Sequence, residues 1–307
     1  MRTAAIDVGG TRLKIALVED GNVLEKHVVD VPDNSHYGEA LELALPTVKA
    51  FGPIDGLGIS FAGLVDPRRR VAIESNGKSA DAASFDLVGW GMHHFGCVPV
   101  LENDANAALI GEMAYGAGRG CRDAVMMILG TGVGTAAYMD GRPVRGAHFQ
   151  AGCLGGHLTV QTDGPMCSCG NRGCVEALAG TWALPRAARA DARFAQSALS
   201  RAETVDFRAI ADACRAGDAL ATDLLHRCVR AWGAGIVNLI HAYDPERVLL
   251  SGGVLHCADL FLEELQRYVD EHAWTPWGKV RFAVAQDPET SVLLGLHHLC
   301  AEGLSAK

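Results

Sequence analysis

The chain has 307 residues, 49% of them hydrophobic and 21% charged, and its formal net charge at pH 7 is −9. This length is more than one compact core usually needs, so we expect about two domains of an ordinary globular protein. The acidic balance argues against nucleic-acid binding, which normally needs a basic surface. The least polar stretch, residues 124–139, is too short and too rich in glycine to span a bilayer, so no membrane association is expected.

The first residues carry an acid at position 7 and no long apolar run, unlike a secretory signal peptide. We therefore expect a cytoplasmic protein whose ten cysteines are thiols or metal ligands rather than disulfides. Six cysteines are scattered singly, and most of them are predicted to be small buried hydrophobic side chains: Cys97, Cys121, Cys214, Cys228, Cys257 and Cys300.

Strands alternate with helices at the start of the chain, which favours an α/β fold. Asp20 and Gly21 stand between two apolar runs, a strong signal for a β-hairpin. The predicted elements are strands Thr3–Val8, Leu13–Glu19 and Val23–Val29, a glycine turn at Gly9–Arg12, a helix from about His36 to Ala50, and a buried strand Gly56–Ser60.

The second half opens in the same way, with strands predicted at Ala124–Leu129 and Thr135–Met139 on either side of a glycine turn. Such internal similarity indicates a duplicated domain with a cleft between the copies. An offset of 120 residues lays Gly10-Thr11 on Gly130-Thr131 and Asp20-Gly21 on Asp140-Gly141.

Asp7 has Met127 as its counterpart, so the acid is present in one copy only and suggests an asymmetric role, such as holding a metal–nucleotide. We expect a small lobe of residues 1–112, with the last helix of about 289–307 packed on it, and a large lobe of residues 113–288. The predicted later elements are helices Phe207–Ala216 and Ala219–Ala242, strand Arg247–Gly253, and a last helix from about Glu289 to Gly303.

One histidine and three cysteines fall within eighteen residues: His157, Cys167, Cys169 and Cys174. One nitrogen and three sulfurs complete a tetrahedral zinc site, and the glycines between the cysteines allow a tight loop. The alternative is a reactive or merely buried cysteine cluster. Four protein ligands leave no position for water, so we expect one structural zinc per chain, which would also fix the place of Glu176.

The two glycine turns, DVGGT and LGTGVG, offer backbone N–H groups that phosphate oxygens can approach closely. A single such turn is more often just a tight hairpin, but two at matching positions favour a nucleotide site. Ser251-Gly252-Gly253 after a buried strand is a third place where backbone could approach a ligand. The P-loop pattern with its lysine is absent.

The stretch ENDANAALIGE follows an apolar strand and leads into a helix. Asn103 or Asp104 could serve only as the N-cap of that helix. A carboxylate at the end of a strand in an α/β sheet is also where ligand groups collect, and Asp104 could accept a proton from a hydroxyl that attacks a phosphate.

Together these motifs resemble the ROK family of bacterial sugar kinases, repressors and uncharacterised proteins. The resemblance covers nearly the whole chain, through DVGGT (7–11), GISFAGLVD (58–66), ENDANAA (102–108), LGTGVG (129–134), GGH (155–157) and CSCGNRGCVE (167–176). It implies a duplicated actin-like (ribonuclease H-like) ATPase fold with two lobes around a cleft. It also implies ATP-dependent phosphorylation of a hexose or amino sugar, as in glucokinases and N-acetylmannosamine kinases, and a homodimer or homotetramer.

The resemblance further implies roles for individual residues. Asp104 would be the catalytic base, and Asp7 the best candidate to orient the Mg²⁺ that accompanies ATP. The implied nucleotide-binding residues are Asp7, Gly9, Gly10, Thr11, Gly130, Thr131, Gly132, Gly134, Gly252 and Gly253. The implied sugar-binding residues are Gly63, Asn76, Asn103, Asp104, His157 and Glu176, and His157 would also ligate the zinc.

Three positions depart from the family pattern. Leu154 replaces the sugar-binding glutamate of Gly-Glu-x-Gly-His, Ala62 replaces a proline, and Thr135 replaces a glycine. The first leaves the sugar open between unmodified glucose and an N-acylated amino sugar or rarer hexose. Family repressors carry an N-terminal helix-turn-helix, which we do not expect here because the phosphate loop begins at residue 7. The remaining alternatives are a non-catalytic sugar sensor and, less favoured because its metal ligands are complete, a zinc-dependent hydrolase.

Overall fold

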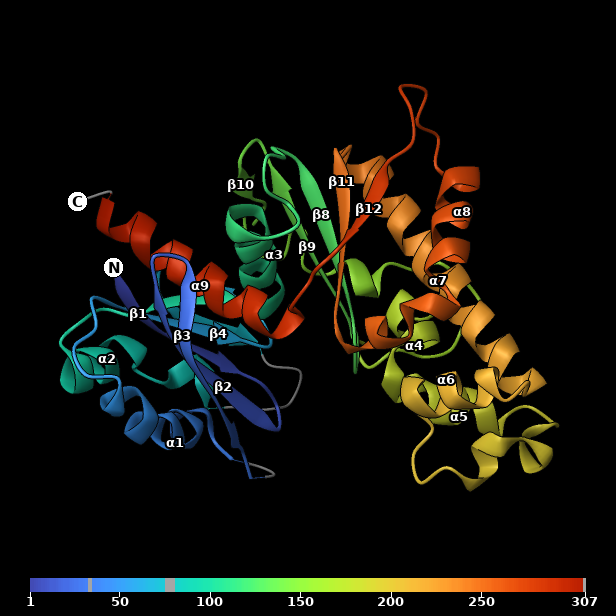
Figure 1. Ribbon diagram of the computed structural model, residues 1–307, viewed down its shortest axis with the longest axis horizontal. Helices are drawn as coiled ribbons and strands as arrows, with labels where there is room; N and C mark the ends of the chain where they lie inside the picture. Colours follow the sequence, from blue (N-terminus) through green and yellow to red (C-terminus); the bar gives the residue numbers. More distant parts are fainter. Residues whose placement is uncertain (33–34, 75–80, 306–307) are drawn as a thin grey trace. The chain divides into compact units, whose positions relative to one another are not determined.

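A computed structural model describes residues 1–32, 35–74 and 81–305 (Figure 1). The chain forms two compact units, which we call the first unit and the second unit. The first comprises Met1–Cys121, Pro143–Ala151 and Ala285–Lys307, and the second comprises Arg122–Arg142 and Gly152–Val284. These bounds lie a few residues from the predicted ones and add residues 143–151 to the first unit, so the division at 112/113 and 288/289 stays a prediction.

The first unit is built on a five-stranded sheet of order β3-β2-β1-β4-β7. Strand β1 is antiparallel to β2 and parallel to β4, and β4 is parallel to β7. The strands are β1 (Arg2–Val8), β2 (Arg12–Glu19), β3 (Asn22–Asp30), β4 (Gly56–Phe61) and β7 (Val100–Asn103), and a small hairpin of β5 (Leu64–Asp66) and β6 (Val71–Glu74) follows β4. The strands predicted for this part of the chain are confirmed.

The second unit repeats this arrangement in the order β10-β9-β8-β11-β12. Both hairpin turns adopt the same left-handed geometry, with φ values of 49° and 78° at Asp20 and Gly21 and of 58° and 73° at Asp140 and Gly141. This is the type I′ conformation that Asp-Gly favours, and it confirms the duplication. The strands are β8 (Ala124–Leu129), β9 (Val133–Met139), β10 (Arg142–Pro143), β11 (Arg247–Ser251) and β12 (Arg281–Val284).

The helices of the first unit are α1 (Tyr37–Ala50), the short η1 (Ala82–Ser84), α2 (Leu87–Phe95), α3 (Asp104–Tyr115) and α9 (Pro288–Ser305). Helices α3 and α9 pack directly on each other through Gly111 and Gly295 (Figure 1). A Cβ at either glycine would overlap a backbone oxygen of the other helix, so only glycine permits this approach. The last helix therefore packs on α3.

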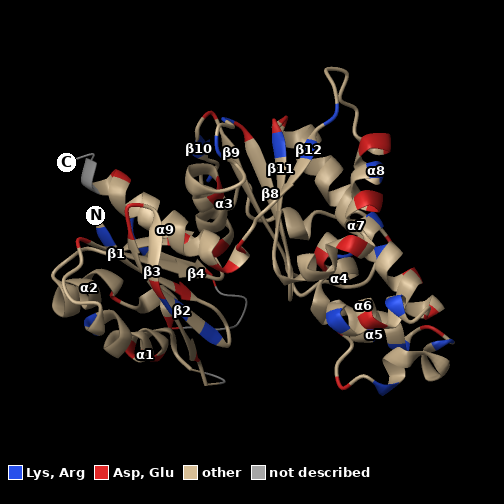
Figure 2. Ribbon diagram, in the orientation of Figure 1, with Lys and Arg blue, Asp and Glu red and all other residues tan. Residues whose placement is uncertain are grey.

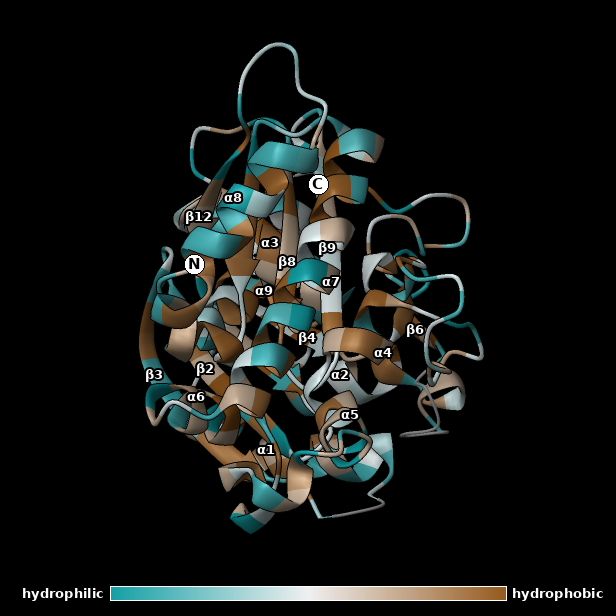
Figure 3. Ribbon diagram, turned by 90° about the vertical axis from the view of Figure 1, so that its right-hand side faces the viewer, coloured by the Kyte–Doolittle hydropathy of each residue, from teal (hydrophilic) through white to brown (hydrophobic). Residues whose placement is uncertain are grey.

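The second unit contains the longest helix, α7, which buries Trp232 completely. Figure 3 shows α7 and α8 with teal and brown stretches in alternation, as expected of helices that bury one side. Figure 2 shows both signs of charge along α8. Its helical elements are η2 (Gly155–His157), α4 (Val175–Ala179), η3 (Thr181–Ala183), α5 (Leu184–Arg189), η4 (Phe194–Gln196), η5 (Ala198–Arg201), α6 (Phe207–Arg215), α7 (Ala219–Tyr243), η6 (Gly253–Leu260) and α8 (Leu262–His272).

The structure describes all ten cysteines, and none of them forms a disulfide. Of the six scattered ones, Cys228, Cys257 and Cys300 are buried, whereas Cys97, Cys121 and Cys214 are only partly buried, so the prediction of burial holds for half of them. Within the described ranges, none of the helices is both long and apolar enough to cross a membrane.

Candidate active site

Asp7 lies near the end of β1, between residues of both neighbouring strands. The strand register places it opposite Lys14 on β2 and opposite Ser60 on β4. Directly paired residues share one face of a sheet. Ser60 Oγ donates a hydrogen bond of 2.6 Å to Asp7 Oδ1, and Lys14 Nζ lies 3.7 Å from Asp7 Oδ2. The carboxylate is thus held in one orientation beside a cation.

The glycine turn after β1 closes through a hydrogen bond of 3.0 Å from Gly9 N–H to the Arg12 carbonyl. Gly10 and Thr11 at its tip are exposed. The turn therefore presents backbone to solvent directly after Asp7, as a phosphate-binding loop requires.

Asn103, and not Asp104, is the N-cap residue of α3. Its Oδ1 accepts a hydrogen bond of 3.1 Å from Asn106 N–H, and its Nδ2 donates to Gly63 O at 3.0 Å. Asn103 Nδ2 also donates to Asp104 Oδ1 at 2.9 Å. Asp104 is therefore free of the capping role, and the predicted neighbour Gly63 touches Asn103 through its backbone. Asn76 lies outside the described residues.

Asp104 stands at the first turn of α3 and is partly buried. Its Oδ1 accepts hydrogen bonds from Ala105 N–H at 2.8 Å and from Asn103, while Oδ2 accepts none from the described residues. Burial, together with the negative charge of Asp7, raises the pKa of Asp104 to about 6. A carboxylate with one free oxygen and such a pKa is suited to accept a proton near neutral pH.

Glu102, one residue before Asn103, forms a buried ion pair that the sequence did not reveal. Its side chain is 1% exposed and pairs through Oε2 with Arg145. Glu102 Oε1 accepts hydrogen bonds from Asn103 N–H at 2.9 Å and from Asn106 Nδ2 at 3.3 Å. Arg145 lies on the segment after β10, so the pair ties this segment to the corner that carries Asp104.

The second glycine loop, Gly130–Gly134, is held at several points within the second unit. Thr181 donates to the Gly130 carbonyl from its N–H at 3.2 Å and from its hydroxyl at 2.7 Å, and Trp182 N–H donates to the Thr131 carbonyl at 3.2 Å. Gly134 is part of β9, opposite Ile128, because this strand begins two residues earlier than predicted.

The glycines after β11 lie beside this loop. Strand β11 ends at Ser251, so Gly252 and Gly253 fall outside it rather than in the predicted strand. Gly252 has a φ of 101°, and a Cβ there would overlap the Leu129 carbonyl at the end of β8. The sheet order thus brings a third glycine-rich turn to the start of Gly130–Gly134.

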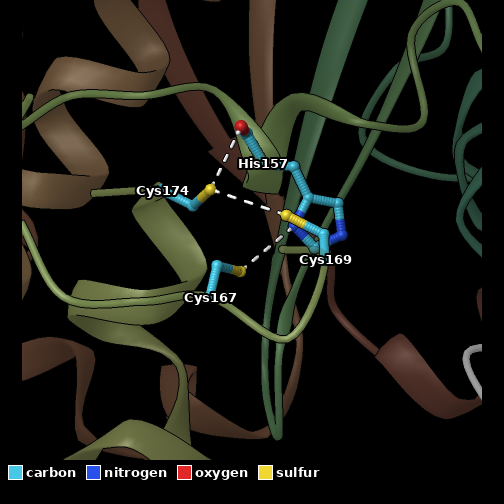
Figure 4. A group of neighbouring side chains, drawn as sticks. All are labelled: His157, Cys167, Cys169 and Cys174. Carbon is cyan, nitrogen blue, oxygen red and sulfur yellow. Dashed lines mark hydrogen bonds between the residues drawn. The ribbon is translucent and has the colours of Figure 1, made fainter. Parts of the chain in front are cut away.

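The four predicted metal ligands converge. Figure 4 shows the side chains of His157, Cys167, Cys169 and Cys174 facing one another, and their ligand atoms all lie within 4.8 Å of one another. Cys169 Sγ lies 3.8 Å from Cys174 Sγ, and Cys167 Sγ lies 3.6 Å from His157 Nδ1. A zinc ion with bonds of about 2.3 Å to sulfur and about 2.0 Å to nitrogen requires tetrahedral edges of about 3.8 Å between two sulfurs and about 3.5 Å between sulfur and nitrogen. The group therefore fits zinc.

Glu176 links the segment that carries the four candidate ligands, residues 157–174, to the glycine loop. We call this segment the metal loop. Glu176 Oε2 accepts a hydrogen bond of 3.0 Å from Val133 N–H, and Glu176 Oε1 accepts one of 3.2 Å from Trp182 Nε1 and one of 3.4 Å from Ser168 Oγ. Each carboxylate oxygen has two lone pairs, so the three donors leave room for one further hydrogen bond. Contact of Glu176 with a sugar hydroxyl stays a prediction.

Comparison with known proteins adds to this geometry. Residues 3–302 match the model of the ROK family. The chain belongs to the ROK family. It is 30% identical to the glucokinase of Thermotoga maritima, over 89% of this chain and 88% of the relative. It is 28% identical to the N-acetylmannosamine kinase of Vibrio cholerae, over 88% of this chain and 89% of the relative.

A solved structure of a ROK family glucokinase from Streptomyces griseus, in complex with glucose and AMPPNP, has a TM-score of 0.82 with this chain at 29% identity. The match covers 99% of this chain and 100% of that protein. With the repeated sheet order, this likeness confirms the duplicated actin-like ATPase fold.

Two of the three departures from the ROK pattern meet in the second unit. Leu154 is 37% exposed although it is apolar. It precedes Gly155, whose N–H donates to Thr135 Oγ1 at 2.7 Å, and that hydroxyl in turn donates to the Gly152 carbonyl at 2.7 Å. Thr135 thus braces the segment that presents Leu154 in this ROK protein. Ala62, the third departure, is exposed next to Gly63.

Proposed function

We propose that this ROK protein is an ATP-dependent sugar kinase in which Asp104 is the general base. The observation that carries the proposal is the state of Asp104, whose pKa is raised to about 6 while one carboxylate oxygen stays free of the described residues. The names of the relatives, glucokinase and N-acetylmannosamine kinase, support a sugar as the acceptor.

In this mechanism Asp104 accepts the proton of a sugar hydroxyl, at C6 or its equivalent, as that oxygen attacks the γ-phosphorus of ATP. The new phosphorus–oxygen bond forms as the bond to the β–γ bridging oxygen breaks, and ADP leaves. Backbone N–H groups of the two glycine loops would stabilise charge on the phosphates. Asp7 would hold Mg²⁺, directly or through water, and the ion would neutralise phosphate charge; Lys14 lies beside Asp7 and would add a positive charge there.

In the second unit, the family resemblance implies sugar binding by His157 and Glu176. His157 presents Nδ1 to the proposed zinc site, which leaves Nε2 to donate to a sugar hydroxyl. Glu176 would accept from another hydroxyl. In the first unit, the residues that the family resemblance implies for sugar binding are Asn103, Gly63 and Asp104. Gly252 and Gly253 would approach the nucleotide.

Leu154 bears on the choice of sugar. An exposed leucine accepts no hydrogen bond, so a hydroxyl that faces it loses the partner that glutamate would offer. An N-acyl group would gain apolar contact there instead. We propose glucose as the first substrate to test and N-acylated amino sugars as the second class.

The direct test measures ADP release from ATP and Mg²⁺ with a panel of hexoses and amino sugars. Turnover with at least one sugar, lost in Asp104→Asn, supports a kinase. Sugar binding in calorimetry without any ADP release would show a non-catalytic sensor.

A further inference from the structure

We propose that Glu176 is a positioning residue for the loop Gly130–Gly134, and that through it the metal loop sets the affinity for nucleotide even before sugar binds. The effect on nucleotide binding rests on the proposed function. The mechanical link, by which we mean the hydrogen bonds that connect the metal loop to the glycine loop through Glu176, depends only on the geometry of the second unit.

The Glu176 carboxylate receives donors from three segments of the second unit. Val133 N–H comes from the glycine loop, Trp182 Nε1 from η3, and Ser168 Oγ from the metal loop, at 3.0, 3.2 and 3.4 Å. Hydrogen bonds to a charged acceptor are stronger than neutral ones. A sugar ligand alone would not need its carboxylate tied to the backbone of the loop.

The glycine loop is shaped around this carboxylate. A Cβ on Gly132 would overlap Glu176 Oε2, whereas a Cβ on Gly130 would meet nothing within 4 Å. A side chain at 132 would therefore displace the Glu176 carboxylate from its place against the loop. The open space at Gly130 is the kind of room that a ligand needs.

Residues 176–182 also fix which way the loop's peptide groups point. The Gly130 carbonyl faces Thr181 and the Thr131 carbonyl faces Trp182, so both carbonyls are turned into the protein. The N–H groups of Thr131 and Gly132 make no hydrogen bond with any residue that the structure describes. These two donors are thus left for an anion such as a nucleotide phosphate.

The metal loop holds Glu176 from both sides. Cys174 is the N-cap residue of α4 and is fully buried, and Glu176 follows it by two residues on that helix. Ser168 stands between the ligands Cys167 and Cys169. A metal bound by the three thiolates would fix both the start of α4 and the position of Ser168. The first places the backbone of Glu176, and the second donates a hydrogen bond to its carboxylate.

The substitution Glu176→Gln tests this link while preserving the shape of the side chain. A glutamine amide has one acceptor oxygen and one donor nitrogen, so it cannot accept from both Val133 N–H and Trp182 Nε1. At best the Val133 N–H keeps a neutral acceptor, and neutral hydrogen bonds are weaker by about 1 kcal/mol than those to a charged group. We therefore expect the hydrogen-exchange rate of the Val133 amide to rise at least about fivefold. We expect the Kd of AMPPNP, measured by calorimetry without sugar, to rise at least about fivefold.

Thr159→Val is the matched control. The Thr159 hydroxyl accepts from Asn171 Nδ2 at 2.9 Å and donates to the Arg172 carbonyl at 3.2 Å, so its hydrogen bonds lie within the metal loop and not with Glu176. It should leave both readouts within about twofold of the wild type. In the wild type, zinc removal with a chelator should reproduce the effects of Glu176→Gln. In the variant it should add little, because zinc removal and the substitution both act through the hydrogen bonds of Glu176.

Unchanged exchange of the Val133 amide in Glu176→Gln overturns the mechanical link. Faster exchange with an unchanged Kd for AMPPNP, or a Kd that changes only when sugar is present, overturns the coupling to nucleotide and leaves Glu176 as a sugar ligand alone. A wild-type protein that binds no nucleotide refutes the proposed kinase function, and the exchange measurement still decides the link.

Discussion

Asp7, near the end of β1, adds its negative charge to the effect of burial, and together they raise the pKa of Asp104, at the start of α3, to about 6. The two acids belong to different motifs, and the parallel strands β1, β4 and β7 bring them to one edge of the first sheet. Ser60 and Lys14 hold Asp7, and Asn103 and Ala105 hold one oxygen of Asp104. This arrangement governs the first two predictions.

Asp104→Asn should lower kcat with the preferred sugar by about two to four powers of ten, the usual effect of losing a general base. The helix keeps its cap because Asn103, not Asp104, is the N-cap residue. Sugar affinity should change little, as measured by calorimetry beside steady-state kinetics. A variant with near wild-type turnover would show that Asp104 is not the base.

The pH profile of kcat/KM should show a loss of activity below about pH 6, because Asp104 must be ionised to accept a proton and its pKa lies at about 6. Asp7→Asn removes the neighbouring charge, so the pKa of Asp104 should fall and the acid inflection of the residual activity should move to lower pH. An inflection that stays in place in Asp7→Asn would assign it to another group.

Arg145→Met should destabilise the first unit by about 3 kcal/mol, because it leaves the Glu102 carboxylate buried without its partner. Thermal and urea unfolding would measure this loss. The double variant Glu102→Gln with Arg145→Met removes both charges and should restore much of the stability. If the single and double variants are equally stable, the loss in Arg145→Met does not come from the unpaired Glu102 charge.

Metal analysis should find one zinc per chain, held by His157, Cys167, Cys169 and Cys174. Cys174→Ser should lose the metal and lower the melting temperature, since a bound structural zinc contributes directly to folding. The buried Cys228, which lies outside the metal group, offers the control, and Cys228→Ala should retain the metal. Metal-free protein with undiminished stability and activity would contradict the assignment.

Leu154→Glu should shift specificity toward sugars with a hydroxyl at the facing position. The leucine leaves such a hydroxyl without an acceptor at a cost of about 1–3 kcal/mol, or about 5- to 150-fold in affinity. The ratios of kcat/KM among glucose, mannose, glucosamine, N-acetylmannosamine and N-acetylglucosamine would measure the change. If every ratio stays the same in Leu154→Glu, Leu154 does not face the sugar.

Local patterns were sufficient to predict the repeated hairpins and the metal group. The Asp-Gly turns at 20–21 and 140–141 depend on the backbone preferences of adjacent residues, which any tertiary context must respect. The four metal ligands lie within eighteen residues, and the glycines between them permit a tight loop, so few folds of this segment could separate them.

Relationships between distant segments could not be predicted in this way. Lys14 and Ser60 face Asp7 because of strand register, and Arg145 reaches Glu102 across 43 residues of sequence. Asn103 rather than Asp104 caps α3 because strand β7 ends at Asn103, a boundary that composition leaves open. Glu176 meets Val133 because α4 packs beside β9. Each of these contacts depends on strand register and on packing between segments far apart in the sequence. The residues nearby in the sequence do not determine which distant side chain becomes the partner.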